Sequence, residues 1–530
     1  MADSRLLPRR TLLRYGVISL PVLVLLLLTA TSGQGHALSS TLSAQAWESK
    51  VDPWVLDRTA ESSQVEFLVF LTEQVDVDSA ARIPSRTERI AAVVRQLRET
   101  AQESQRPLLA ALEQMGVEHR SFWVANMIWV RGDANVVQLL ARRSDVAHVY
   151  ANPRVPLDLP ATGETTESLQ PQAAAWNIAR VRAPEVWAQG VTGAGIIVGG
   201  QDTGYDWQHP ALINQYRGWD GSEADHNYNW HDAIHEGGSI CGPDVPAPCD
   251  DRNHGTHTMG IMVGDDGGEN QIGMAPDARW IGCRNMDNGV GTPATYTECF
   301  QWFMAPTDLA GENPDVLQAP HIINNSWSCP PSEGCTDPAA LQTVAQNVQA
   351  AGIIVVAAAG NTGPSCGTVA NPPAIYEAAF SVGATDTSDT IALFSSRGPV
   401  TVDDSNRLKP DVVAPGMSIR SSVPGSGYGY MQGTSMASPH AAGLAALLLS
   451  ANPALQGEVA EVRALIADTA LPLTTTQSCG DVDGSAVPNN VYGAGRIDAL
   501  AAYEKAIPDP VEERTYRYYF PVWKEGSIRP

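Results

Sequence analysis

The residues of this sequence that point to chemistry lie in three short stretches, which contribute a carboxylate, an imidazole and a hydroxyl. Asp202 stands in Gln-Asp-Thr-Gly after an apolar run, His254 opens His-Gly-Thr-His-Thr-Met-Gly, and Ser435 stands in Gly-Thr-Ser-Met-Ala. A serine hydroxyl becomes a nucleophile when an imidazole removes its proton, and a carboxylate on the far ring nitrogen stabilises the imidazolium. Each motif alone is common, so it is their joint occurrence that predicts an acyl-transfer site.

A fourth stretch supplies a hydrogen-bond donor for the same chemistry. An apolar run is followed by Gly360 and Asn361, which puts a side-chain amide at the carboxyl end of a predicted strand. Sites in α/β sheets lie at that edge. This amide, and the free backbone N–H groups at the start of the predicted helix that carries Ser435, suit a developing oxyanion.

The elements that must position these groups form an α/β pattern between residues 173 and 506. Buried strand-like runs, such as 195–198 and 353–356, alternate with helical stretches, among them an apolar helix over 441–449. Continuous apolar runs are typical of parallel strands covered by helices on both faces. The predicted architecture is therefore a parallel sheet flanked by helices.

These stretches, with the order Asp, His, Ser, resemble the subtilisin family of serine proteases (subtilases, the peptidase S8 family) over about residues 170–506. The runs 323–328 and 249–260 resemble the bacillopeptidase F-like branch of that family. The resemblance implies a subtilisin-like fold and a secreted serine endopeptidase that hydrolyses peptide bonds through an acyl-enzyme. It also implies that the chemistry needs no cofactor.

The resemblance assigns a role to each candidate catalytic residue. Asp202 orients the histidine, His254 is the general base and acid, and Ser435 is the nucleophile. Asn361 forms the oxyanion hole with the backbone N–H of Ser435. His254 is chosen over His257 because the family uses the first histidine of the motif. The remaining histidines of these motifs and their neighbours are interpreted as packing or hydrogen-bonding residues: His209, His257 and His440.

The resemblance also implies where the first substrate pocket lies. It should be bounded by two strands, with a floor near residues 368–370. The residues expected to bind substrate are Ser326, Trp327, Ser328, Ala358, Ala359, Gly360 and Ala370. None of them carries a carboxylate, so a lysine or arginine buried in the pocket would have no charged partner. Uncharged, mostly apolar substrate side chains should therefore be preferred. Ser328 stands where the family usually has glycine, which could narrow the subsites.

Residues 41–160 are predicted to form a separate α+β module. Strand-like runs at 65–71, 122–130 and 146–150 flank helical patterns, which suggests the order β-α-β-β-α-β of a ferredoxin-like fold. The module has no cluster of nucleophile, base and acid. It resembles the family's propeptide, which implies an intramolecular inhibitor and a self-cleaving precursor, cut between about Val155 and Gln172.

The remaining segments are interpreted as export, processing and tail regions. Residues 1–37 have an arginine-containing start, an apolar run and small residues, the layout of a signal peptide. An N-terminal membrane anchor is the alternative. Residues 161–172 are a Thr-, Gly- and Glu-rich processing linker, and 507–530 form an aromatic C-terminal tail. The predicted location is extracellular.

Composition limits the partners. The formal net charge of −24 disfavours nucleic acid and bare anionic membrane, leaving polypeptide substrates and the chain's own propeptide. The acidic loops at Asp225, Asp250 and Asp251 suggest either structural calcium or solvated turns, and turns are favoured.

Eight cysteines, an even number in an exported chain, predict disulfides. Proximity suggests 241 with 249, 283 with 299 and 329 with 335, which leaves 366 and 479, although eight cysteines allow 105 pairings. No Cys-x-x-Cys spacing occurs, so zinc is not expected.

Two other functions remain open. One is a maturation protease with narrow specificity. The other is a catalytically silent relative used for binding, against which the intact set of Asp202, His254, Ser435 and Asn361 argues.

Overall fold

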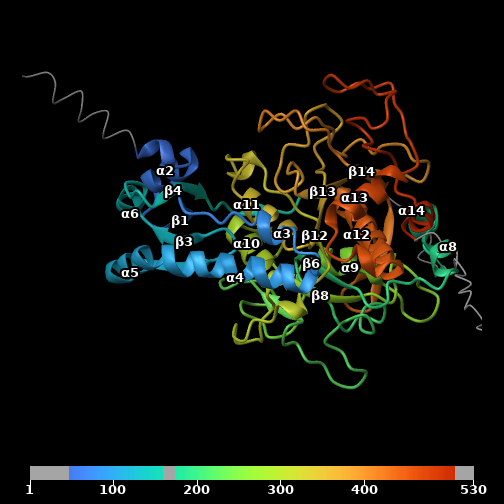
Figure 1. Cartoon of the computed structure of the whole chain (residues 1–530), viewed down its shortest axis with the longest axis horizontal. Helices are drawn as coiled ribbons and strands as arrows, with labels where there is room; N and C mark the ends of the chain where they lie inside the picture. The colour runs from blue at the N-terminus through green and yellow to red at the C-terminus, as the bar shows by residue number, and fades with distance from the viewer. Residues whose placement is uncertain (1–46, 159–173, 508–530) are drawn as a thin grey trace, which may run out of the picture. The chain divides into compact units, whose positions relative to one another are not determined.

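A computed structural model describes residues 47–158 and 174–507 (Figure 1). The predicted signal segment 1–37, the linker 161–172 and the tail beyond residue 507 lie outside the described residues. All described residues fall within one compact unit. None of the helices in the described ranges has the length and apolar character needed to cross a bilayer.

A seven-stranded sheet forms the centre of the larger module, in the order β14-β13-β12-β11-β6-β8-β7. Every neighbouring pair is parallel. This confirms the predicted α/β architecture. The strands are β6 (Ile197–Asp202), β7 (Trp230–Asp232), β8 (Arg279–Arg284), β11 (Ile322–Asn325), β12 (Ile354–Ala358), β13 (Ala379–Thr385) and β14 (Val412–Pro415).

Both faces of this sheet are buried, and β12 shows how. Ile354 and Val356 pack in the core that contains α12 (Thr434–Ala451). The alternate residues, Val355 and Ala357, pack in the core that contains α10 (Pro293–Met304) and α11 (Gln342–Ala350). Because side chains alternate along a strand, a continuous apolar run supplies both layers at once.

The smaller module has an antiparallel sheet in the order β2-β3-β1-β4. With α4 and α5 after β1 and α6 after β3, it follows the expected β-α-β-β-α-β order. The strand-like run predicted over 122–130 is interrupted, because β2 ends at Phe122, residues 123–126 form a turn with Asn126 at φ 44°, and β3 begins at Met127. The elements are β1 (Val65–Leu71), α4 (Arg86–Ser104), α5 (Arg106–Met115), β2 (Glu118–Phe122), β3 (Met127–Gly132), α6 (Ala134–Ala141) and β4 (Val146–Ala151).

One small sheet contains strands from both modules, in the order β5-β10-β9. Its strands are β5 (Val155–Pro156), β9 (Met286–Asp287) and β10 (Val290–Gly291). The remaining helices and strands are α2 (Pro53–Glu61), α3 (Asp78–Ala81), α7 (Trp176–Arg180), α8 (Ala183–Trp187), α9 (His254–Val263), β15 (Ile419–Val423), β16 (Gly427–Met431), α13 (Val459–Asp468) and α14 (Ala499–Ala506). The 3-10 helices are Glu48–Lys50, Val316–Gln318, Pro331–Glu333 and Pro453–Leu455.

All eight cysteines are paired, and the pairing suggested by proximity is confirmed. The disulfides are Cys241–Cys249, Cys283–Cys299, Cys329–Cys335 and Cys366–Cys479.

Candidate active site

The carboxylate and the imidazole meet where β6 ends and α9 begins. Asp202 is the last residue of β6, and His254 is the first residue of α9. His254 Nδ1 lies 2.7 Å from Asp202 Oδ1, and both side chains are buried, with 0% and 2% exposed. The backbone N–H of Thr203 also donates to Asp202 Oδ1 (2.7 Å). Because Nδ1 is bound to the carboxylate, Nε2 is the nitrogen left for proton transfer, and it has no hydrogen-bond partner among the described residues.

Two glycines allow this close approach of strand and helix. A Cβ on Gly204, which has φ +107°, would lie 1.7 Å from the carbonyl oxygen of Cys249. A Cβ on Gly255 would lie 2.1 Å from the carbonyl oxygen of Gly204. The glycines that follow the aspartate and the histidine in their motifs are therefore required by sterics.

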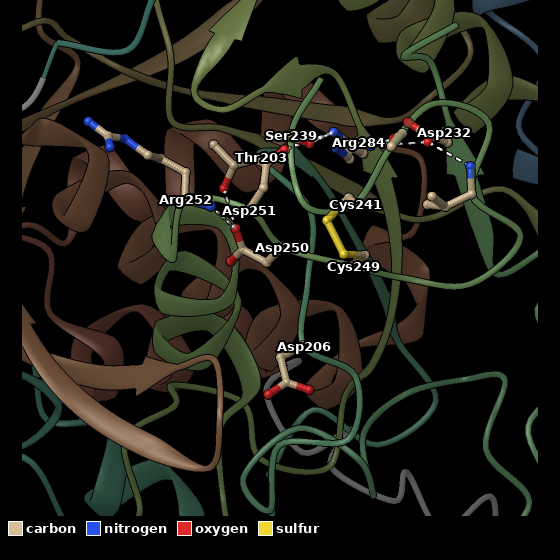
Figure 2. The surroundings of a disulfide bond; sticks show 12 residues. Thr203, Asp206, Asp232, Ser239, Cys241, Cys249, Asp250, Asp251, Arg252 and Arg284 are labelled. Atoms are coloured by element: carbon tan, nitrogen blue, oxygen red, sulfur yellow. Dashed lines mark hydrogen bonds and ion pairs between the residues drawn. A yellow bond between two sulfur atoms is a disulfide. The ribbon is translucent and has the colours of Figure 1, made fainter. Parts of the chain in front are cut away.

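Asp250 joins the same two elements, and Figure 2 shows it beside Thr203 and Arg252. It accepts hydrogen bonds from the hydroxyls of Thr203 (2.8 Å) and Thr256 (2.6 Å) and from three backbone N–H groups, those of residues 252, 253 and 256. Thr203 Oγ1 in turn accepts from the N–H of Gly255 (3.0 Å). Burial raises the pKa of Asp250, and these hydrogen bonds oppose the rise. The carboxylate therefore fixes the residue after Asp202 and the first turn that begins with His254.

The calcium interpretation of the acidic loops is not supported by these contacts. Asp250 is occupied by its five donors, and Asp251 lies 2.8 Å from the fully buried guanidinium of Arg284, which also contacts Asp232 (Figure 2). Asp225 accepts from Asn227 in an exposed turn. In the described ranges, no group of three or more His, Cys, Asp or Glu residues could hold a metal ion.

Ser435 is the second residue of α12, at the N-terminus of this long buried helix. Its hydroxyl donates to the carbonyl of Ser326 (3.0 Å), and Ser326 Oγ donates back to the carbonyl of Ser435 (2.8 Å). The structure therefore joins Ser435 to the end of β11, and it records no hydrogen bond between Ser435 and His254.

The amide of Asn361 has a defined orientation. Its Oδ1 accepts from both the N–H (2.9 Å) and the hydroxyl (3.0 Å) of Thr434, the residue before Ser435. This turns Nδ2 the other way, where it donates to the backbone carbonyl of Asp158 (3.1 Å). A side-chain amide thus already donates to a main-chain carbonyl from the smaller module.

Residues 193–495 match the family model described as the subtilase family. The chain belongs to the subtilase family. It is 33% identical to bacillopeptidase F of Bacillus subtilis (strain 168) over 527 residues, which cover 92% of this chain and 35% of that protein. The chain thus spans about a third of the length of this relative. It is also 31% identical to subtilisin Savinase of Lederbergia lenta over 332 residues, 62% of this chain and 99% of the relative. By family, the chain is a subtilisin-like serine endopeptidase, a hydrolase.

The cleft of this subtilase contains a cavity of about 260 Å³ that reaches Ser435 and Asn361. Of the predicted substrate-binding residues, five line it: Ser326, Trp327, Ser328, Ala358 and Gly360. Ala359 is buried behind the wall, and Ala370 is replaced in the lining by its neighbour Asn371. Trp327 stacks on Tyr296 with ring centroids 3.8 Å apart, which makes it a fixed wall.

Sequence reasoning missed several residues of the cleft. Met286, Tyr296 and Glu333 line the cavity. Met286 belongs to the hairpin of β9 and β10, in which Asn288 and Gly289, both at positive φ, make the turn. Asn-Gly is a hairpin signal, so the hairpin itself could have been predicted. Glu333 lies in the loop closed by Cys329–Cys335, and no local pattern marks it.

The other histidines of the subtilase motifs bond to the backbone, as expected. His257 Nε2 lies 3.0 Å from the carbonyl oxygen of Ile419, and burial lowers its pKa to about 3. His440 Nδ1 lies 2.8 Å from the carbonyl oxygen of Met436, and burial lowers its pKa to about 4. His209 Nε2 likewise lies 2.8 Å from the carbonyl oxygen of Gly427. The two fully buried rings are neutral at neutral pH.

Proposed function

We propose that this chain is the precursor of a secreted endopeptidase whose module at 173–506 cuts peptide bonds with Asp202, His254 and Ser435. The observation that carries the proposal is the hydrogen bond from Asn361 Nδ2 to a main-chain carbonyl lying in the cleft beside Ser435. A donor that meets a substrate-like carbonyl is what an oxyanion hole requires.

The geometry supports the following sequence of proton and bond movements. Ser435 exchanges its hydrogen bond to Ser326 for one to the unpartnered Nε2 of His254, which takes the proton as Oγ attacks the carbonyl carbon. The oxyanion receives Asn361 Nδ2 and the backbone N–H of Ser435. His254 then protonates the leaving amine, and water hydrolyses the acyl-enzyme by the reverse transfers. Burial of the Asp202–His254 pair keeps the tautomer fixed throughout.

No step of this mechanism uses a cofactor, and the proposed substrates are polypeptides. Specificity at the residue before the cut is proposed to favour uncharged side chains, because the five predicted substrate-binding residues that line the cavity are neutral. Export through the predicted signal segment at 1–37 would place the enzyme outside the cell.

The module at 41–160 is proposed to be an intramolecular inhibitor. It docks on the helices that cover one face of the central sheet. Gln301 of α10 accepts from the backbone N–H of Trp123 (2.6 Å), and Asn347 of α11 donates to the carbonyl of Val124 (2.7 Å). The ion pair of Arg120 with Glu298 (3.1 Å) lies beside them. These contacts use the β2–β3 turn, which gives that turn a role in docking.

The test is a comparison of the wild-type precursor with Ser435→Ala and with Ser450→Ala, which changes a serine at the far end of the same helix. Wild type and Ser450→Ala should be processed, should bind a fluorophosphonate at Ser435 and should cleave casein. Ser435→Ala should stay full length and unlabelled. Normal processing of purified Ser435→Ala would overturn self-cleavage, and absence of label on the processed wild type would favour a silent binding relative. A peptide-library profile separates a general protease from a narrow maturation protease.

A further inference from the structure

We infer that the bond the precursor cuts in itself is Asp158–Leu159, with residues 155–158 filling the four substrate positions before the cut. This inference rests on the proposed function and deepens it, because it fixes one bond within the wider range predicted from the sequence. It also places the cut before the predicted linker at 161–172.

The first support is the register of the segment in the cleft. β5 pairs antiparallel with β10, with Val155 opposite Gly291 and Pro156 opposite Val290. The N–H of Leu157 continues the ladder by donating to the carbonyl of Gly289 (2.7 Å). An extended peptide that adds to a strand edge in this way is held by main-chain hydrogen bonds, whatever its sequence.

Side-chain burial fixes the same register. Val155 is 1% exposed, whereas its neighbour Pro156 is exposed and Leu157 is half-buried. A slip by one residue would move each side chain to the opposite face and would expose Val155. The register therefore determines which carbonyl reaches the oxyanion donor.

That carbonyl belongs to Asp158. Asn361 Nδ2 donates to it at 3.1 Å, and Thr434 prevents the amide from turning away. Because an oxyanion donor must face the carbonyl that is attacked, the reacting carbon is that of Asp158. Ser435 lines the same cavity as Asp158.

The step balances as an ordinary acyl transfer. Ser435 Oγ bonds to the carbonyl carbon of Asp158, the C–N bond to Leu159 breaks, and His254 gives its proton to the new amino group of Leu159. Water then cleaves the ester, leaving a carboxylate on Asp158 and restoring the Ser435 hydroxyl.

Asp158 is an unfavourable residue for the position directly before the cut, so this bond would be a poor substrate if it were presented by a separate molecule. The described residues that line the cavity include no Lys, Arg or His, and Glu333 adds a like charge. An intramolecular bond does not need a matching pocket, because its effective concentration is very high. After the cut, the propeptide ends in Asp158, and this end should bind the first substrate pocket less tightly than a propeptide that ends in an apolar residue.

The experiment follows processing of the full precursor at early times, with mass spectrometry of both products. The new N-terminus should be Leu159 and the propeptide should end at Asp158. Leu159→Pro should slow this cut at least 100-fold, because proline after a scissile bond disfavours attack and leaving-group departure, whereas Leu159→Ala and Thr162→Pro should be cut at the wild-type rate. A first cut at any other bond, or normal processing of Leu159→Pro, would overturn the assignment.

Fluorophosphonate labelling separates the two ways in which the experiment could fail. If Ser435 is labelled in the product but the first cut lies elsewhere, only the bond assignment is wrong. If nothing is cut and nothing is labelled, the proposed function is wrong as well.

Discussion

At the scale of single residues, the candidate site depends on groups that hold Asp202, His254 and Asn361 in place. Asp202 is fixed by the N–H of Thr203, and Asn361 by Thr434. Asp250 lies one step further out and accepts five hydrogen bonds from the strand end and the helix start. We therefore treat Asp250 as a positioning residue for the pair of Asp202 and His254.

Asp250→Asn should lower kcat at least tenfold, equivalent to about 1.4 kcal/mol, with KM nearly unchanged. The asparagine side chain would point its own N–H group at hydrogen-bond donors. At least one buried donor would then be left unsatisfied, which should lower the free energy of unfolding by about 1–3 kcal/mol. The measurements are kcat and KM against pH and thermal unfolding of the inhibited enzyme. Asp225→Asn, in an exposed turn, is the matched control. An unchanged kcat in a destabilised Asp250→Asn protein would leave Asp250 a purely structural residue.

Specificity can be measured with peptides of the form Val-Pro-Leu-Xaa that copy the bound segment. We expect kcat/KM to be highest for Leu and Phe at Xaa and at least tenfold lower for Lys and Asp, because a charge would be buried in a pocket whose five predicted wall residues are neutral. A preference for Lys would show that Glu333 pairs with the substrate.

At the scale of helices and strands, an element could be predicted from the sequence when the residues that determine it lie within the element itself. The runs at 195–198 and 353–356 predicted buried strands because their own side chains fill both cores. The motifs around Asp202, His254 and Ser435 also pointed to the candidate site, since their glycines and helix starts are local requirements. The docking of the β2–β3 turn on α10 and the pairing of β5 with β10 escaped prediction, because their partners lie in another part of the chain.

The disulfides should differ in their effect on the elements that they join. Removing Cys366–Cys479, whose cysteines are 113 residues apart, should cost about 5 kcal/mol on the chain-entropy model, and removing Cys329–Cys335, 6 apart, about 2 kcal/mol. The measurement is the Tm of the two double Cys→Ala variants as inhibited mature enzymes. Equal losses would mean that loop closure is not the main contribution. Reactive thiols in denatured wild-type protein would contradict the pairing itself.

At the scale of the whole molecule, acid should unfold the mature enzyme through its buried neutral histidines. The pKa values of His257 and His440 are lowered from 6.5 to about 3 and about 4. Between those values and 6.5 the unfolded chain binds more protons than the folded one, so stability falls as pH falls. Each histidine should remove at most about 2 kcal/mol by pH 5.

Urea unfolding of the covalently inhibited enzyme between pH 7 and pH 4 tests this. We expect a steady loss of stability below pH 6.5, with a smaller slope in His440→Gln. A stability that stays flat from pH 7 to pH 4 would contradict the assignment of both rings as neutral.

The antiparallel pairing at β10 also has a consequence for which proteins the enzyme can digest. A polypeptide must present about four residues as a free, straightened strand before its carbonyl reaches Asn361, as residues 155–158 do. Helical segments, and strands already paired in a sheet, cannot do this without local melting. We expect the order in which a folded target is nicked to follow the mobility of its loops, with the side chain in the first pocket choosing only among bonds that such motion has already exposed.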